Sequence, residues 1–299
     1  MIKAYVNLIL AMVIVGSSVV AGKIMVSGLP VFLSSGLRFL LASVIIVPVL
    51  FYLEGGLPRL SIRSLMILVV QALCGSFLFT VCLLFGLRFV SPASAGIITS
   101  TTPAFMGVIG WTFFREKCSA LSCGGIVLSF AGILVLSVGQ EGGSSSLIGL
   151  LLVLGAVVAE SMFLVFRKWI NEPLSPLAAT ALISFFGLLW FLPASLYEYS
   201  QCDLSAVPFE AWVAVCYYGA VVTVLAYLCW FAGVVRVKAS VAGAFTGIMP
   251  VSAVLLSSLV LGEELRWFHL CGCVLVCAGI LFSSGFFAAR QTGEVVRAQ

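Results

Sequence analysis

Long uncharged stretches dominate the pattern of hydrophobic and polar positions along this chain of 299 residues. A helix that crosses a lipid bilayer needs about 20 consecutive, mostly apolar residues, and ten runs are close to that length or longer. Short segments rich in Gly, Pro and Ser separate most of them, as is typical of loops between helices. The runs cover residues 4–26, 31–53, 65–87, 93–114, 120–138, 148–168, 175–197, 209–232, 239–261 and 267–288. The pattern predicts an all-α integral membrane protein with ten transmembrane helices.

The composition indicates the same class of protein. Hydrophobic residues make up 62% of the chain and charged residues 9%, whereas soluble domains are about one-quarter charged. A surface with so few charges suits a lipid bilayer as its solvent. The net charge of +4 comes from dispersed basic residues. They form no basic stripe with interleaved aromatic residues, so no nucleic acid is expected as a partner.

The distribution of Lys and Arg predicts the orientation, because cytoplasmic loops carry an excess of these residues. If the N-terminus is cytoplasmic, 11 of the 15 basic residues fall on the cytoplasmic side. Lys23, Arg88 and Arg266 then face outward, and Arg38 lies within a helix. We therefore expect a multi-pass protein of the cell inner (cytoplasmic) membrane with both termini in the cytoplasm. The run at 4–26 is too long for the core of a signal peptide and is expected to be retained.

The chain contains an internal repeat. Residues 94–117 and 241–264 lie 147 positions apart, and both have Ala-Gly at their second and third positions. Both also have Thr sixth, Pro tenth and Glu twenty-third. A shared hydrophobic composition would match leucines and valines, but it would not place Pro, Glu, Gly and Thr in register. The register therefore indicates a duplicated unit.

Each copy of the repeat holds five of the predicted helices. We expect residues 1–140 to form the first copy, 147–288 the second, and 289–299 a cytoplasmic tail. Because five is odd, the second copy enters the membrane from the opposite side, which is the inverted-topology repeat of many secondary transporters. Pro103 and Pro250 occupy equivalent positions and are expected to kink their helices. A substrate site belongs between the copies, near the bilayer midplane.

Several short motifs occur along the chain in a specific order and spacing. They are Gly16-Ser-Ser-Val-Val-Ala-Gly-Lys23, Gly36-Leu-Arg-Phe-Leu-Leu-Ala42, Val90-Ser-Pro-Ala-Ser-Ala-Gly96, Arg115-Glu-Lys117, Tyr217-Tyr-Gly-Ala220, Ala226-Tyr-Leu-Cys-Trp-Phe-Ala232 and Gly262-Glu-Glu264. In this order they resemble the drug/metabolite transporter superfamily, in its EamA-like family, and the likeness covers nearly the whole chain. One departure is Val15-Gly16, where the family often has Trp-Gly.

The resemblance implies two inverted five-helix repeats around a central cavity. In the family that cavity is lined mainly by the first, third, fourth, sixth, eighth and ninth helices. Members export or import amino acids, related metabolites, nucleotide sugars and drugs, and some relatives export opine-type metal chelators. The resemblance therefore implies a transporter and leaves its cargo open.

Two charged residues lie deep in apolar runs, Glu160 in the sixth predicted helix and Arg38 in the second. Each costs about 2.5–3.5 kcal/mol at the bilayer centre on insertion scales, so each needs a cavity, a partner or a function. For Glu160 the functional alternatives are proton coupling and binding of a substrate amine. The structural alternatives are a buried ion pair and a hydrogen bond to Ser or Tyr. In the related small multidrug resistance proteins the equivalent helix carries the essential glutamate, which favours a function by analogy.

Arg38 has a structural and a functional interpretation. We expect its guanidinium to reach the outer interface or to pair with a backbone carbonyl. The alternative is a clamp for the carboxylate of a substrate.

Further candidates are polar or aromatic residues on one helix face or beside a predicted kink. Gln71 and Phe79 recur at helical spacing with Gly75 and Cys82. Hydroxyls beside Pro103 could bind a substrate or only bond their own helix. Aromatic residues could stack on a ligand, pack in the core or face lipid. The residues expected to line the substrate site are Ser17, Ser18, Gln71, Phe79, Thr99, Ser100, Glu160, Tyr217, Tyr227, Trp230 and Thr246.

Other chemistry finds little support. Nine of the ten cysteines lie within or at the edges of apolar runs, where Cys acts as a small hydrophobe, so no metal site is expected. His269 is the single histidine; we expect it at the membrane interface, without the acid and nucleophile that catalysis needs. No phosphate-binding Gly-x-x-x-x-Gly-Lys-Ser/Thr loop occurs, and no cofactor is expected. Glu116 and Glu263, at equivalent helix ends, are expected to cap helices or to form gate pairs.

These features predict a secondary active transporter, not an enzyme, that exports small polar metabolites by alternating access. Amino acids or amino-acid-derived compounds are the favoured cargo, with protons as a coupling ion through Glu160. Export of cationic drugs is the alternative within this class. An integral-membrane enzyme or a scaffold subunit is disfavoured by the shortage of buried His, Asp and Glu and by the repeat. The expected partners are the lipid bilayer and a small-molecule substrate, and the chain is expected to act as a monomer or homodimer.

Overall fold

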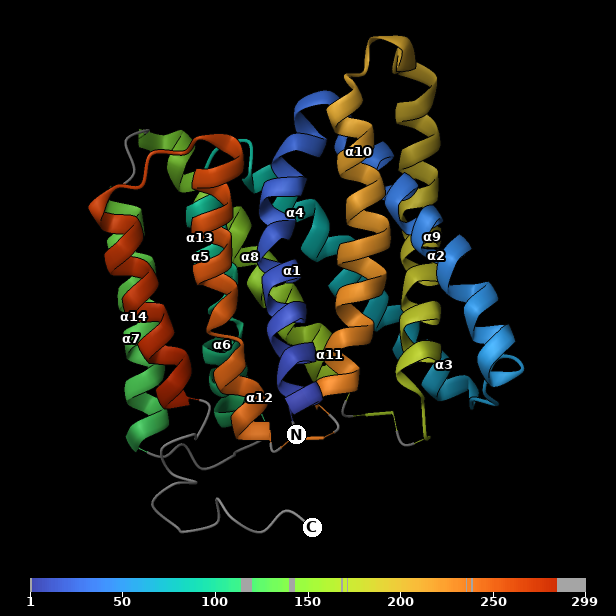
Figure 1. Cartoon of the computed structure of the whole chain (residues 1–299), viewed down its shortest axis with the longest axis horizontal. Helices are drawn as coiled ribbons and strands as arrows, with labels where there is room; N and C mark the ends of the chain where they lie inside the picture. The colour runs from blue at the N-terminus through green and yellow to red at the C-terminus, as the bar shows by residue number, and fades with distance from the viewer. Residues whose placement is uncertain are drawn as a thin grey trace.

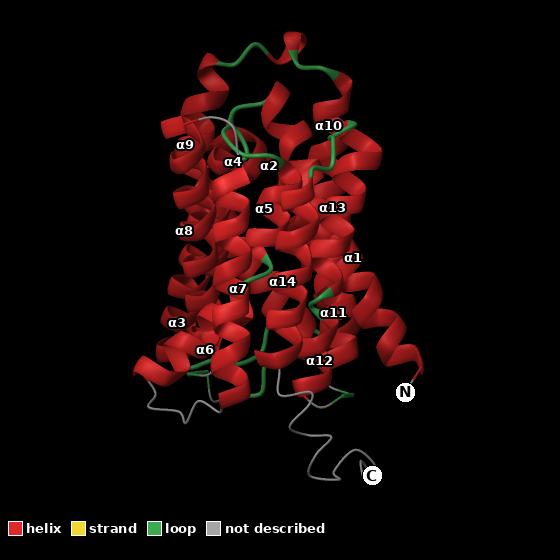
Figure 2. Ribbon diagram, turned by 90° about the vertical axis from the view of Figure 1, so that its left-hand side faces the viewer, coloured by secondary structure: helices red, strands yellow, loops and turns green. Residues whose placement is uncertain are grey.

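The structure is a computed structural model that describes residues 2–113, 120–139, 143–167, 169–170, 172–234, 236–237 and 239–283. Within these ranges the chain is all-helical and has no strand, and the helices run lengthwise with loops at both ends (Figure 2). The expected gate residue Glu116 and the expected tail, residues 289–299, lie outside the described residues. The predicted all-α class is confirmed.

The helices of the first half follow the predicted apolar runs closely. They are α1 (Ile2–Gly28), α2 (Val31–Glu54), α3 (Ile62–Ala72), the π-helical segment η1 (Leu73–Leu78), α4 (Phe79–Gly86), α5 (Pro92–Thr99), α6 (Thr102–Phe113) and α7 (Ala120–Gly139).

The second half has the same succession of long and interrupted helices. Its elements are α8 (Gly143–Arg167), α9 (Pro176–Gln201), the 3₁₀ turn η2 (Leu204–Ala206), α10 (Phe209–Tyr217), the π-helical segment η3 (Tyr218–Leu225), α11 (Ala226–Val234), α12 (Ala239–Phe245), α13 (Ile248–Leu261) and α14 (Trp267–Ser283).

Eight helical stretches in the described part of the chain are long and apolar enough to cross a membrane. Two of the ten predicted runs are not among them. The run at 93–114 is divided between α5 and α6, and α14 is described over only 17 residues. The protein is therefore a multi-pass membrane protein.

The helices form a bundle in which each half contributes to every region. α7 packs along α14 at one edge, α2 packs along α9 toward the other, and α1 lies centrally against α13, α11 and α10 (Figure 1). The chain begins α1 and ends α14 at the same end of the bundle. Segments distant in sequence are thus neighbours throughout.

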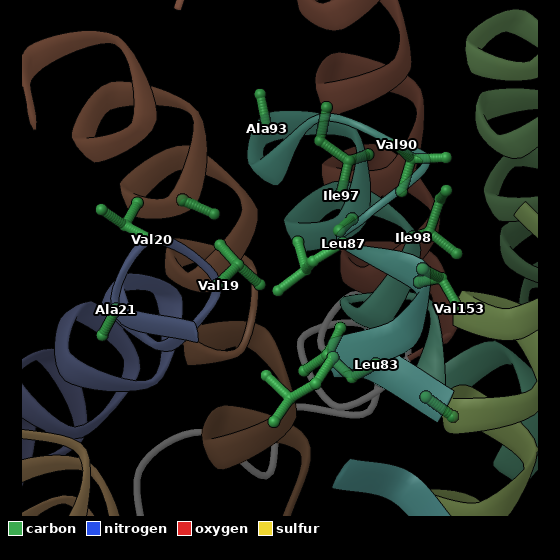
Figure 3. Packing of buried hydrophobic residues seen from close by; sticks show 14 of the residues in the cluster. Val19, Val20, Ala21, Leu83, Leu87, Val90, Ala93, Ile97, Ile98 and Val153 are labelled. Atoms are coloured by element: carbon green, nitrogen blue, oxygen red, sulfur yellow. The ribbon is translucent and has the colours of Figure 1, made fainter. Parts of the chain in front are cut away.

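The main apolar core joins α1, α4, α5 and α8 (Figure 3). Val19, Leu83, Leu87, Ile98 and Val153 are among its members, and each is at most 1% exposed. Because lipid tails are as apolar as Leu, such packing holds the helices together by close van der Waals contact rather than by exclusion of water. The core therefore depends on complementary shape.

Glycines allow close contact between α7 and α14. A Cβ atom added to Gly125 would lie 2.7 Å from the backbone oxygen of Gly279, and one added to Gly132 would lie 3.0 Å from that of Gly272. Small residues let membrane helices approach in this way. A shift of 147 positions converts Gly125 to Gly272 and Gly132 to Gly279, so exchanging the two halves reproduces the contact.

The helix irregularities also recur at the same register. Shifted by 147 positions, η1 coincides with residues 220–225 of η3. After the same shift, the break between α5 and α6, at Ser100 and Thr101, lies within one residue of the break between α12 and α13 at Thr246 and Gly247. Pro103 and Pro250 lie in the first turn after these breaks. The predicted helices over 65–87 and 209–232 correspond to helical stretches long and apolar enough to span a membrane, Ile62–Gly86 and Phe209–Val234, and each contains a π-helical segment.

Acidic side chains secure the ends of several helices. The backbone N–H of Leu33, near the start of α2, donates to Glu198 Oε2 at the end of α9 (2.7 Å). At the other end of this antiparallel pair, Ser175 Oγ, the N-cap of α9, donates to Glu54 Oε2 at the end of α2 (2.8 Å). Each helix thus supplies an acid to the N-terminus of the other, where free N–H groups and the helix dipole favour negative charge.

A third acid lies in the connection between α8 and α9. Ser61, the N-cap of α3, and Ser64 both donate hydroxyl hydrogen bonds to Glu172. These bonds, that of Ser61 first, lower the pKa of Glu172 to about 2. Glu172 is therefore ionised at neutral pH and links the start of α3 to the second half.

Candidate functional site

Glu160 lies on α8, beside the break between α5 and α6 of the first half. Thr102 Oγ1 donates to Glu160 Oε2 at 2.6 Å and is also 2.8 Å from the carbonyl oxygen of Thr99. Thr102 is the first residue of α6, directly after the break, so the break itself brings its hydroxyl to the carboxylate. Glu160 keeps part of its surface accessible. The structural alternative of a buried ion pair does not describe it, since its partner is a hydroxyl.

Arg38 is 5% exposed and lies in the interior of α2. Its Nη2 donates to Thr80 Oγ1 at 3.0 Å. Its guanidinium carbon lies 4.2 Å from the ring centre of Tyr218 and 4.4 Å from that of Phe39. The prediction that the guanidinium of Arg38 reaches the outer interface or pairs with a backbone carbonyl is wrong. The side chain is too enclosed to reach the outer interface, and it contacts a hydroxyl and two aromatic rings.

Both π-helical segments adjoin Arg38. Thr80 follows η1 by two residues, and Tyr218 is the first residue of η3. A Cβ atom added to Gly219 would lie 2.9 Å from the carbonyl oxygen of Arg38, so glycine permits the close approach of η3 to α2. Since π-helical turns occur frequently at functional sites, this junction belongs to the candidate site.

Tyr227 lies near both charged residues, Glu160 and Arg38. It lies close enough to Glu160, Arg38 and Tyr218 to interact electrostatically with all three. Its side chain is half-buried, as is that of Glu160. The structure thus brings one carboxylate, one guanidinium and two tyrosines from both halves into one neighbourhood.

Two further predicted residues make contacts between helices. Gln71 is 1% exposed, and its Nε2 donates to the carbonyl oxygen of Phe163 on α8 at 2.9 Å. Ser17 Oγ lies 2.6 Å from the hydroxyl of Tyr217, which joins α1 to α10. Both contacts cross between the first and second halves.

Within the described part of the chain, side-chain hydrogen bonds do not bring the remaining predicted residues into this cluster. The hydroxyls of Thr99, Ser100 and Thr246 bond carbonyls of their own helices, as the structural alternative had it. Ser18 is buried on α1, whereas Phe79 and Trp230 are half-buried. The cluster contains three residues outside the predicted set: Thr80, Thr102 and Tyr218. Thr102 lies in the hydroxyl-rich turn before Pro103 and Tyr218 beside Tyr217, so both had a sequence signal, whereas Thr80 had none.

A second polar cluster lies where the loop before α14 meets α5. Glu263 Oε2 accepts the backbone N–H of Ala93 at 3.1 Å, which agrees with its expected role as a helix cap. Its other oxygen lies 3.6 Å from His269 Nε2, which is 3.3 Å from Ser91 Oγ. His269 is 4% exposed, more enclosed than the interfacial position expected for it.

The described residues contain no group of three or more His, Cys, Asp or Glu side chains arranged to hold a metal ion. The described cysteines form no disulfide with one another. The chemistry available at the candidate site is therefore proton exchange at Glu160, charge pairing at Arg38 and hydrogen bonding by the tyrosine and threonine hydroxyls.

Comparison with known proteins gives two family matches and a set of full-length relatives. The EamA-like transporter family matches residues 2–138 and again residues 147–285. Uncharacterized transporter YetK of Bacillus subtilis is 43% identical over 281 residues, which are 93% of this chain and 85% of that protein. A Salmonella typhimurium protein named as a probable amino-acid metabolite efflux pump is 25% identical over 296 residues, 96% of each chain.

The fold has a counterpart among solved structures. A crystal structure with 18% sequence identity superposes with a TM-score of 0.68 and covers 96% of this chain and 98% of its own. At this identity the likeness concerns the fold alone.

Proposed function

The chain belongs to the EamA-like transporter family, and from this premise we propose that it is a secondary transporter that exports small polar metabolites by alternating access. The favoured cargo is an amino acid or an amino-acid-derived compound. The similarity to a named amino-acid metabolite efflux pump supports that cargo. The relatives reported above are named transporters, which agrees with the expectation that the chain is not an enzyme.

The proposed architecture is ten transmembrane helices arranged as two inverted five-helix repeats, residues 1–140 and 147–288. The two family matches support a duplication. The matching register of the π-helical segments, and helix breaks that agree to within one residue, support it further. We place the protein in the inner membrane with both termini cytoplasmic. The Lys and Arg distribution supports this orientation, as do helices α1 and α14, which start and end at one end of the bundle.

Glu160 and Thr102 carry the proposal of proton coupling. The Thr102 hydroxyl has one proton but lies within hydrogen-bond distance of both Glu160 and the Thr99 carbonyl. When Glu160 is ionised, it accepts a hydrogen bond from the Thr102 hydroxyl. When Glu160 is protonated, it donates a hydrogen bond to Thr102 Oγ1, and the Thr102 hydroxyl donates its own to the carbonyl oxygen of Thr99. Both protonation states of Glu160 are thus satisfied without an ion pair, as a residue that cycles between them requires. Because Thr102 follows the break before α6, this break would respond to the protonation of Glu160.

The test is transport by the purified protein in proteoliposomes, with a panel of labelled amino acids and with or without a pH gradient. Wild type is expected to move one class of amino acid. Glu160→Gln is expected to lose the pH-driven part and to retain exchange between labelled and unlabelled cargo. Glu264→Gln, which changes an exposed acid in the loop before α14, is the matched control and is expected to behave as wild type.

Two results would contradict this proposal in different ways. If wild type moves nothing on the panel, the amino-acid cargo is wrong. If Glu160→Gln responds to the pH gradient as wild type does, Glu160 is structural and the coupling site lies elsewhere.

Export of cationic drugs is a second candidate, supported by the nearness of Tyr227 to Glu160. A carboxylate beside an aromatic ring can hold an organic cation. Growth of cells that express the chain in the presence of toxic cations separates the two candidates. Resistance that requires Glu160 favours the drug exporter. The protein is proposed to act as a monomer or homodimer, because one chain supplies both repeats.

A further inference from the structure

Arg38 carries an uncompensated positive charge inside the bundle. Although it is 5% exposed, its Nε and Nη1 have no hydrogen-bond partner. Only Nη2 is used, by Thr80. A buried ionic group without partners is costly, and proteins keep such groups paired unless another requirement intervenes.

No acidic side chain in the described part of the chain neutralises this guanidinium. The one ion pair recorded there joins His269 to Glu263, at another place in the bundle. Glu160 bonds to Thr102 instead. Two aromatic faces, Phe39 and Tyr218, stabilise the cation, but they leave its charge in place.

Other unmatched polar atoms occur on α2 and on the neighbouring α3. Ser43 Oγ, on α2, and Gln71 Oε1, on α3, are also buried without a partner. Few buried polar groups lack partners in folded proteins, and such groups call for an explanation. Together with Arg38, they account for all such side-chain atoms in the described part of the chain except Glu263 Oε1, which lies 3.6 Å from His269 Nε2.

We propose that Arg38 is the subsite for an anionic group of the cargo, a carboxylate, which pairs with one of the unpaired nitrogens, Nε or Nη1, and with the second N–H of Nη2, while Thr80 keeps the first. The planar fork of a guanidinium matches a carboxylate bidentately. The subsite would select acids over their neutral amides. This inference rests on the proposed transport function but assigns a specificity that the function itself leaves open.

Access to the subsite depends on η3. Tyr218, whose ring covers the guanidinium, is the first residue of that π-helical segment, and Gly219 holds the segment against the backbone of α2. Neither unpaired nitrogen is exposed in this conformation. The carboxylate therefore enters when the first turn of η3 moves away from α2, which couples binding to a displacement in the second half.

The test compares acids with their matched amides. L-Leucine and L-leucinamide, L-phenylalanine and L-phenylalaninamide, and L-threonine and L-threoninamide compete for transport in proteoliposomes. The same pairs, with acetate and acetamide and with benzoate and benzamide, are tested for thermal stabilisation of the purified protein in detergent. Wild type is expected to prefer acids about tenfold or more, the range of a hydrogen bond to a charged group.

Arg38→Gln is expected to reduce that preference to below about threefold, by weakening the acids rather than the amides, and Arg38→Lys to keep part of it. Arg88→Gln is the matched control, because Arg88 is exposed and also stacks over a ring, that of Phe85 (5.0 Å). It is expected to leave the preference unchanged. If Arg38→Gln does not fold, the same comparison is made with Arg38→Lys and Thr80→Val, and both must lower the ratio.

The possible results separate this inference from the proposed function. An acid preference that survives every folded Arg38 variant, or wild type that shows none in either assay, overturns the subsite even if transport occurs. If wild type moves no amino acid but is stabilised by carboxylates in an Arg38-dependent manner, the subsite stands and the amino-acid cargo is wrong.

Discussion

Charged residues at the helix ends and in the middle of the bundle differ in how fully their hydrogen-bonding groups are paired. At the ends, Glu198, Glu263 and Glu172 each accept a hydrogen bond at the N-terminus of a helix distant in sequence. In the middle, Arg38 leaves two nitrogens unpaired, and Gln71 leaves its oxygen unpaired. The middle of a membrane bundle is poorer in water than the helix ends, so the cost of an unpaired group is at least as large in the middle.

The difference shows where the fold serves stability and where it reserves polar capacity. Acids at helix ends satisfy N–H groups that the helices cannot satisfy themselves. The middle leaves donors and acceptors without partners, as the proposed subsite at Arg38 would require of groups that exchange partners during transport. Four substitutions, ordered by expected effect, can break or sharpen this comparison.

The largest effect is expected from Glu160→Gln in the middle. Transport driven by a pH gradient is expected to fall to the level of empty liposomes, because an amide cannot take up and release the proton. The melting temperature is expected to change little, since the amide oxygen still accepts from Thr102. A large loss of stability with intact pH-driven transport would reverse the assignment of Glu160 to function.

Thr80→Val is expected to destabilise the protein by about 1–3 kcal/mol, because it leaves a third guanidinium nitrogen of Arg38 without a partner. Chemical denaturation in detergent measures the change. A neutral result would indicate that water already serves Arg38, which would weaken the contrast between the two regions. Thr112→Val, at an exposed position where the hydroxyl bonds its own helix, is the control.

Glu198→Gln is expected to cost about 1–2 kcal/mol, because a charge-assisted bond to the N–H of Leu33 becomes a neutral one. Transport per folded molecule is expected to match wild type. Thermal unfolding and proteoliposome transport of the same preparation measure both quantities. Impaired transport at normal stability would show that the ends of α2 and α9 also move during the cycle.

The smallest effect is expected from Glu172→Gln. The folded-state pKa of Glu172 lies below its usual value, so its contribution to stability is present above the unfolded pKa and disappears as the pH falls toward about 2. The variant should melt about 2 °C below wild type at pH 7. The gap should begin to narrow below about pH 4.5 and close as the pH approaches about 2. A gap that is independent of pH would mean that the carboxylate charge is not what stabilises the start of α3.

The sequence predicts the helical segments well, because a span must be long and apolar regardless of its neighbours. It also identifies Glu160 and Arg38, since a charge within an apolar run is conspicuous whatever surrounds it. It does not identify Thr80 as a partner of Arg38. A lone threonine in a helix more often bonds its own backbone, as Thr99 does.

The two π-helical segments illustrate the same limit. Residues 73–78 and 218–225 have an apolar composition that fits a regular helix equally well. Packing between helices can stabilise the additional residue per turn, as where Gly219 lies against the backbone of α2. The register of the repeat was visible in the sequence, but the irregularity that repeats was not.

By itself, the sequence determined that the chain is a helical membrane protein with a duplicated unit and two charges in apolar surroundings. The tertiary structure alone decided that Thr102 bonds Glu160 and that Arg38 lies between Thr80 and Tyr218 with two nitrogens unpaired. Hydrophobic length and repeat register are properties of consecutive residues. Partnership of a buried polar group depends on which distant helix packs against it, and that is set by the shape of the assembled bundle.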